Sequence, residues 1–264
     1  MATLTKIAKG FAVAAVIALP GIAQAIPVGG IEVGNGVLTF VSSTIMEEKV
    51  GGGIINGNNQ TLHGVGNVTE IRSNGVLVWT PSPTEELTYV FDNYVSQGFT
   101  PTSVGFTGGT VQFWHDTTAN LTGANYNTGT GFGNGSLWLD LVGIAFDDPL
   151  HPFSCTGVTL CGTGVLTGTV DINGSGLLGV TGLGAADSYF NTNGTPAIGT
   201  GNLADFQIGS NANNQNPIGF IMGTHGTASI SNVRNSVPEP ATIALLGLGL
   251  LGIAVSGRKR GHAK

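Results

Sequence analysis

The run Ser136-Leu-Trp-Leu-Asp-Leu-Val-Gly-Ile144 decides the fold class of this chain. Large apolar residues recur at every second position over part of it, and turn-forming residues lie close to both ends. A period of two is typical of a β-strand with one buried face. The same pattern marks Thr110-Val-Gln-Phe-Trp114 and Leu87-Thr-Tyr-Val-Phe91, whereas the 3.6-residue period of an amphipathic helix is nearly absent.

Short runs of the same kind continue through the middle of the chain between stretches of Gly, Asn, Thr and Pro. They cover residues 75–79, 164–172, 205–208, 219–222 and 228–233. Two Gly- and Asn-rich segments, 50–60 and 191–217, predict long loops. Because strands follow one another without intervening helices, we expect an all-β body over residues 26–236, folded as an antiparallel β-sandwich or a jelly-roll-like domain.

The composition narrows the class of protein. Gly accounts for 44 of 264 residues, about one in six, against about 7% in ordinary domains. Charged residues account for only 9%, against about 25% in ordinary domains. A coiled coil or a highly charged disordered chain is therefore excluded. Between residues 26 and 236 stand three basic and fourteen acidic residues, a net charge of −11. Such a body repels phosphate backbones, so nucleic acid is not an expected partner.

Residues 1–25 have the three parts of a secretory signal peptide. These parts are the basic Lys6 and Lys9, the apolar residues 11–19, and the pair Pro20-Gly21 before Ala23-Gln-Ala25. The apolar run is too short to span a bilayer, which disfavours the alternative of an N-terminal anchor helix. We expect cleavage after Ala25, so that the mature chain starts at Ile26 outside the cytoplasm.

Cys155 and Cys161 are the only cysteines. An even number of cysteines in an exported chain favours a disulfide, which would here brace a turn. Two free thiols remain the alternative. A zinc site is less favoured, because no second pair of Cys or His stands at ligand spacing.

Residues 237–264 form a second terminal signal. Val237-Pro238-Glu239-Pro240 precedes seventeen uncharged residues, 241–257, and then Arg258-Lys259-Arg260. The uncharged segment is long enough for a single transmembrane helix across a thin membrane. The basic cluster is expected to stay cytoplasmic, which places the body outside.

This arrangement resembles the PEP-CTERM sorting signal of bacterial surface proteins. The resemblance implies recognition by an exosortase, transient residence in the inner membrane, and a Gram-negative host that makes extracellular polysaccharide. The alternative is a permanent membrane anchor. The stretch from Leu87 to Leu139, with Phe106-Thr-Gly-Gly-Thr-Val and Gly135-Ser-Leu-Trp-Leu, is similar to PEP-CTERM proteins associated with flocculation.

Candidate cofactor and metal motifs are weak. G-x-G-x-x-G occurs at 174–179 and 247–252, but a chain this rich in Gly contains such matches by chance, and neither lies in a βαβ setting. Asp171-Ile-Asn-Gly-Ser-Gly176 copies the start of a calcium loop, yet Gly182 stands where the bidentate acid belongs. We therefore assign no cofactor and no metal. A looser calcium site using Asp171, or one near Asp140, Asp147 and Asp148, stays open beside the simpler interpretation of solvated turns.

Catalytic constellations are not evident either. His115 and Asp116 are neighbours, but adjacent side chains of a strand point to opposite faces and make no dyad. Paired carboxylates are available, although a sequence does not give their separation: Glu47, Glu48, Glu85, Glu86, Asp147 and Asp148. Three tryptophans lie in apolar runs and are predicted to fill the core, with a sugar-stacking platform as the alternative: Trp79, Trp114 and Trp138.

The expected function follows from the two termini and the polar, weakly charged body. We expect a non-enzymatic exported protein, structural or adhesive, at the cell surface or in the extracellular matrix of a biofilm or floc. Its partners would be an exosortase and the extracellular polysaccharide or matrix. The alternative is a secreted carbohydrate-binding or carbohydrate-active protein that uses the same signals.

Overall fold

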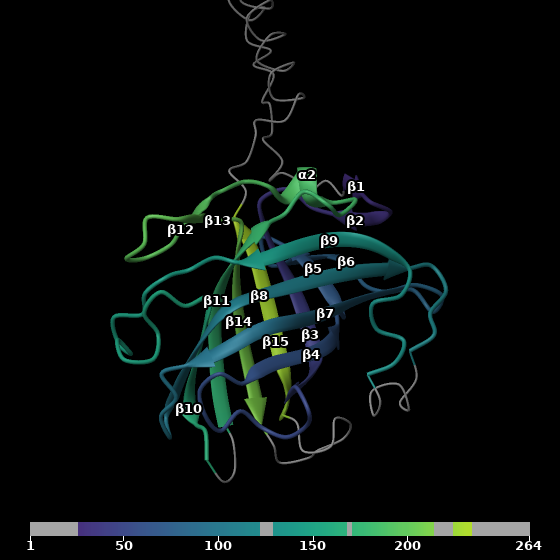
Figure 1. The fold of residues 1–264 in the computed structure, drawn as a ribbon. Coiled ribbons are helices and arrows are strands. Elements are labelled where there is room, and N and C mark those ends of the chain that lie inside the picture. Colours follow the sequence, from purple (N-terminus) through teal and green to yellow (C-terminus); the bar gives the residue numbers. More distant parts are fainter. Residues whose placement is uncertain (1–25, 122–128, 168–170, 214–223, 234–264) are drawn as a thin grey trace, which may run out of the picture.

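The computed structural model describes residues 26–121, 129–167, 171–213 and 224–233 (Figure 1). Antiparallel strands dominate it, so the all-β prediction is confirmed. The elements are β1 (Ile26–Val28), β2 (Ile31–Val33), β3 (Val37–Lys49), β4 (Thr61–Asn67), β5 (Glu70–Ser73), β6 (Val76–Trp79), β7 (Glu86–Gln97), β8 (Ser103–Asp116), β9 (Ser136–Gly143), β10 (Leu160–Val165), β11 (Asp171–Val180), α2 (Asp187–Phe190), β12 (Thr195–Pro196), β13 (Leu203–Ala204), β14 (Phe206–Asn213) and β15 (Thr224–Val233).

The main sheet closes on itself. Its strands neighbour one another in the order β3, β4, β7, β8, β10, β11, β14 and β15, and β15 pairs back onto β3 from Val37↔Val233 to Glu47↔Thr224. Like β10, β9 pairs with both β8 and β11, along a different part of these two strands. The β5–β6 hairpin is joined to the sheet by the pairing of β5 with β3. We call this ring of strands the closed sheet.

The topology corrects the prediction of a sandwich or a jelly roll. Figure 1 shows β4, β7, β8 and β9 crossing in front of β3, β11, β14 and β15, so two layers do face each other as in a sandwich. The layers nevertheless belong to one continuous closed sheet, and its described strands follow chain order without a jelly-roll crossover. Alternation of apolar and polar residues indicates that one face of a strand is buried, but it does not identify the neighbouring strand. The closure of the sheet was therefore not predicted.

Aromatic rings fill the space between the layers at one end of the closed sheet. Phe40 packs against Phe113, Trp138, Phe190 and Phe206 with ring centroids 5.7–6.1 Å apart. All five side chains are at most 2% exposed. The tilted and edge-on geometries are those that aromatic rings prefer, and the cluster is the centre of the hydrophobic core.

Glycines make room for rings on the neighbouring strand. Gly64 and Gly66 of β4 lie directly opposite Phe91 and Tyr89 of β7. A Cβ added at Gly64 would overlap the Phe91 ring, and one at Gly66 would overlap the Tyr89 ring. The high Gly content therefore serves packing in the sheet as well as turns, because each ring covers a backbone that has no side chain of its own.

Buried carboxylates attach the segment between β11 and β14, residues 181–205, to the closed sheet; we call it the connecting segment. Asp187 of α2 accepts hydrogen bonds from the backbone N–H of Asp140 (3.1 Å) and of Gly182 (2.8 Å). Asp205 accepts one from the N–H of Val180 (2.8 Å). Both carboxylates are at most 3% exposed. Backbone donors to a charged acceptor offset the cost of burying it, so these acids serve the fold.

The local predictions are right in part. Residues 164–172 were expected to form one strand, but β10 ends at Val165 and β11 begins at Asp171. Residues 191–217 were predicted to form a long loop apart from the strand at 205–208; residues 206–208 of that strand lie in β14, whereas β12 and β13 were not predicted. The predicted strand at 219–222, the signal helix within 1–25 and the transmembrane helix at 241–257 lie outside the described residues. Among the helices of the described ranges, none is long and apolar enough to cross a bilayer.

Candidate functional site: a pocket beside a disulfide-braced loop

Two chain segments cover the outer surface of β11 and β14. One is the loop of residues 146–161, which we call the disulfide loop. The other is the β12–β13 hairpin, residues 195–204. They form a second, smaller hydrophobic cluster on the sheet: Phe146, Cys155, Val158, Cys161, Leu177, Ala197 and Ala204. The cluster holds both segments in place and leaves a hollow between them.

The disulfide loop is fixed at its base. Cys155 and Cys161 are joined in a disulfide with their Cα atoms 5.5 Å apart, the pairing expected from the sequence. Phe146 and Val158 exchange two backbone hydrogen bonds of 2.8 and 3.1 Å. The N–H of Asp148 donates to the carbonyl oxygen of Cys155 at 2.7 Å. Both cysteines are almost fully buried, so the brace lies beneath the loop.

Asp148 organises the first turn of the loop. Its carboxylate accepts hydrogen bonds from the Leu150 N–H (2.9 Å) and lies 2.9 Å from Nδ1 of His151. Burial alone would raise the pKa of Asp148, but the hydrogen bonds from His151 and Leu150, together with the charge of His151, outweigh burial and lower that pKa. The ionised carboxylate therefore stabilises the turn.

Asp147 connects the disulfide loop to the hairpin. Its N–H donates to the Ile198 carbonyl oxygen (2.9 Å), and its Oδ1 accepts from the Gly157 N–H (2.8 Å). Gly199 has a φ of +80°, and a Cβ there would overlap the Asp147 carboxylate. Glycine is thus required twice over at this contact, for its backbone conformation and for the space.

The hollow between the segments is a pocket of about 290 Å³, which we call the loop pocket. Its polar lining comes from Asp147, Asp148, Ser175, Thr195 and Gln207, and its apolar lining includes Phe146, Leu177 and Ile198. Oγ1 of Thr195 is buried and has no hydrogen-bond partner within the described part of the chain. A buried hydroxyl without a partner costs free energy. The atom has almost no solvent-exposed surface, so a ligand in the pocket reaches it only after a small shift of the lining.

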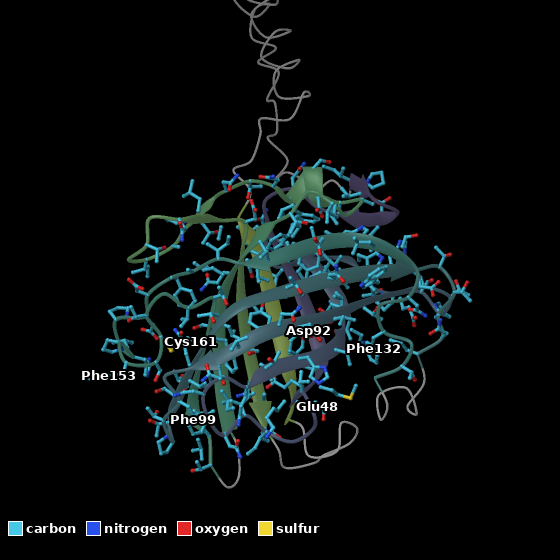
Figure 2. All side chains as sticks on the ribbon, in the orientation of Figure 1. Glu48, Asp92, Phe99, Phe132, Phe153 and Cys161 are labelled. Carbon is cyan, nitrogen blue, oxygen red and sulfur yellow. A yellow bond between two sulfur atoms is a disulfide. The ribbon has the colours of Figure 1, made fainter. Side chains whose placement is uncertain are left out.

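The disulfide loop also projects two large apolar side chains. Leu150 is 82% exposed and Phe153 is 95% exposed. Figure 2 shows Phe153 at the outer rim of the molecule, with Cys161 on the inward side of the same loop. Two strongly exposed apolar residues on one braced loop are typical of a contact surface.

Comparison with protein-family models gives one match. Residues 236–260 match the PEP-CTERM protein-sorting motif. The resemblance seen in the sequence is therefore confirmed, and the motif indicates an exported protein that is targeted by an exosortase and leaves through the membrane for the cell surface. The comparisons with curated proteins and with solved structures find no match.

The PEP-CTERM match includes both groups of residues quoted for it, Val237–Pro240 and Arg258–Arg260. Those residues, and Ala23 and Ala25 of the expected signal cleavage site, lie outside the described ranges. The comparison thus supports the sorting step, whereas the structure describes the body that the PEP-CTERM motif follows.

The calcium candidates do not gather into one site. Asp140 is buried beneath the connecting segment, where it accepts a hydrogen bond from Nε2 of Gln112 at 2.9 Å. Among the described residues, only Asp148, His151 and Cys161 bring three potential ligand atoms within 4.8 Å of one another. The Cys161 sulfur belongs to the disulfide, so this group lacks a thiolate. Among the described residues, Asp171 and Asp147 join no such group, and a looser calcium site stays an alternative to solvated turns.

The tryptophans lie mainly in the core. Trp138 is 1% exposed and its Nε1 donates to the Val28 carbonyl oxygen at 2.8 Å, while Trp79 is 8% exposed. Trp114 is half-buried. The core interpretation is right for Trp79 and Trp138, which leaves no stacked platform of three exposed tryptophans.

Three of the remaining acidic candidates have partners elsewhere in the chain, while the fourth, Glu47, lies on β3 opposite Gly64 of β4. His115 does not pair with its neighbour Asp116; its Nε2 lies 2.8 Å from Oε1 of Glu85. Glu86 is buried and its Oε2 accepts from the Asn120 and Leu121 N–H groups. Glu48 lies 3.4 Å from His63 across β3 and β4.

Sequence reasoning missed Thr195 and Gln207 of the loop pocket. Thr195 stands in a segment that was expected to be a loop and Gln207 in a predicted strand, and both are ordinary polar residues, so nothing in the sequence distinguishes them. Leu150 and Phe153 carried a signal that was not used. They are large apolar residues beside prolines, in a loop next to the first cysteine, where a polar residue is the usual choice.

Proposed function

We propose that this protein is a non-enzymatic component of the cell surface or extracellular matrix, with a structural or adhesive role after exosortase sorting. The observation that carries the proposal is the exposure of Leu150 and Phe153 on a loop that a disulfide braces. Covering such side chains with another surface lowers the free energy by about 25 cal/mol per Å² of apolar area removed from water.

The rigidity of the loop favours attachment. Binding by a flexible loop costs conformational entropy, and a loop that is already ordered avoids much of that cost. The disulfide and the backbone hydrogen bonds of Phe146 and Asp148 hold the disulfide loop before any partner arrives. The two apolar side chains are therefore presented by a preorganised support.

The use of the carboxylates supports a role without catalysis. Asp187 and Asp205 are buried acceptors of backbone hydrogen bonds, and Glu86 fixes the chain at Asn120 and Leu121. Acids engaged in this way maintain the fold.

The sorting step can be tested in the host. We expect replacement of Pro238, Glu239 and Pro240 by Ala to leave the body folded but to trap an unprocessed, membrane-bound form. Cell fractionation followed by mass spectrometry of the processed end measures this. Normal processing and delivery of the triple variant would contradict sorting through the motif.

The adhesive role can be tested with substitutions at the loop tip. We expect the double variant Leu150→Ser/Phe153→Ser to be exported normally and to partition less into the matrix fraction. Leu183→Ser is the matched control, because Leu183 is 74% exposed but belongs to the connecting segment before α2. Equal matrix partition of all three proteins would refute the proposed role of the loop.

A further inference from the structure

We propose that the loop pocket binds one unit of a neutral sugar chain. This inference rests on the proposed surface function and names the ligand class of the same region. It is carried by the juxtaposition of Thr195, Gln207 and Asp147 with an apolar wall in one open hollow.

The polar lining offers both kinds of hydrogen-bonding group. The carboxylates of Asp147 and Asp148 accept, the Gln207 amide donates and accepts, and the hydroxyls of Ser175 and Thr195 do either. The Thr195 hydroxyl has no partner among the described residues, and because the atom is buried it becomes available to a ligand only when the lining shifts slightly. A ligand that fits must therefore carry several hydroxyl groups at close spacing, because each serves as donor and acceptor.

The rest of the lining requires an apolar face on the same ligand. Phe146, Leu177 and Ile198 lie beside the polar groups, so a fully hydrated ion or a small inorganic anion would leave them uncovered. A sugar ring combines hydroxyl edges with a face of C–H groups. The volume of about 290 Å³ lies at the lower limit of small-molecule sites, which suits one ring rather than several.

Charge selects neutral sugars over acidic ones. The residues that line the loop pocket include Asp147 and Asp148 and contain no Lys or Arg. Residues 26–236 as a whole carry a net charge of −11. A uronic acid unit would bring a further carboxylate next to two others, and like charges at this spacing are costly to desolvate.

The test uses the mature protein purified from the extracellular fraction of its host. Binding is measured against two neutral polysaccharides, dextran and galactomannan, and against alginate as the acidic one, each with and without EDTA. We expect retention by at least one neutral polymer, none by alginate, and no effect of EDTA. Binding to alginate alone, binding that EDTA abolishes, or binding to none of the three polymers would overturn the inference.

Two substitutions locate the site. Thr195→Val keeps the shape of the side chain and removes the hydroxyl, while Gln207→Ala removes an exposed amide from the surface of β14. Each is expected to weaken binding about three- to tenfold, as for the loss of one hydrogen bond. Thr80→Val is the matched control, because Thr80 is exposed next to β6, outside the pocket lining. Wild-type affinity in both pocket variants would place the sugar elsewhere.

The outcomes separate this inference from the proposed function. If the purified protein binds no neutral polymer but still partitions into the matrix, the loop pocket inference fails and the surface function stands. If it binds a neutral polymer through Thr195 and Gln207 but is absent from the surface and matrix fractions, the surface function fails and the pocket assignment stands.

Discussion

Replacing Gly64 by Ala tests whether the aromatic rings of β7 pack directly on the glycines of β4. Gly64 is buried between β3 and β7, opposite Glu47 on one side and Phe91 on the other. A Cβ at this position would lie closer than 3.0 Å to both the Met46 carbonyl oxygen and the Phe91 ring. The ring can rotate away, but the carbonyl belongs to a paired strand and cannot, so strands must separate.

The expected cost follows from that overlap. Forcing an additional carbon into a packed interior costs about 1–3 kcal/mol. Ala also lowers the conformational entropy of the unfolded chain relative to Gly, and this offsets about 0.4–1 kcal/mol of the cost. The midpoints of these two ranges leave a net cost of about 1.3 kcal/mol. With a shift of about 2–4 °C per kcal/mol for a domain of this size, the melting temperature should fall by about 3–5 °C.

Thermal and denaturant unfolding of the mature protein measure the effect. Gly57→Ala is the matched control, since its Cβ would meet nothing closer than Nε2 of Gln60 at 3.5 Å, an ordinary contact. We expect that control to unfold at or slightly above the wild-type temperature. If Gly64→Ala and Gly57→Ala unfold at the same temperature, the argument that rings require bare backbone in β4 is wrong.

Two further predictions concern the disulfide loop. The double variant Cys155→Ser/Cys161→Ser should stay folded and lose about 2 kcal/mol of stability, the chain-entropy value for so short a loop; equal melting of the wild-type protein with and without reductant would contradict this. Asp148→Asn should lower the melting temperature at neutral pH, because the folded carboxyl has a lowered pKa and its ionised form is the stabilising one. That difference should shrink as the pH falls through about 4, where the carboxyl gains its proton in the unfolded chain and then in the folded one; a difference that stays constant from pH 7 to pH 3 in a melting series would refute it.

The sequence predicted the strands with regular alternation. Residues 136–143 of the first run form β9, and residues 110–114 and 87–91 lie within β8 and β7, because one face of each strand is apolar and buried. β3 was missed although, among the strands that the structure describes, only β8 is longer. Ser42 and Glu47 interrupt its apolar face, and its pairing with β15 shifts register between Gly226 and Ala228, so no simple period runs through it.

The loop pocket was less predictable than the sheet. Asp147 and Asp148 were recognised as neighbouring carboxylates, and the cysteine pair was recognised from its spacing. Thr195 and Gln207 reach the pocket only because β12 and β14 are placed beside the disulfide loop by long-range pairing with β13 and β11. Proximity of this kind depends on the whole topology, which local patterns do not contain.

The pairing of β3 with β15 also means that the closed sheet is completed only by the last strand of the body. β3 begins at Val37 and its partner ends at Val233, three residues before the sorting motif starts at 236. One edge of β3 pairs with β4 and β5, but its second edge is paired only when β15, at the far end of the body, joins the sheet. Until then two strand edges are open to other chains, and such edges promote aggregation. The segment that removes the last open edge is thus the one that directly precedes the sorting motif, so a chain truncated shortly before that motif would keep both edges exposed.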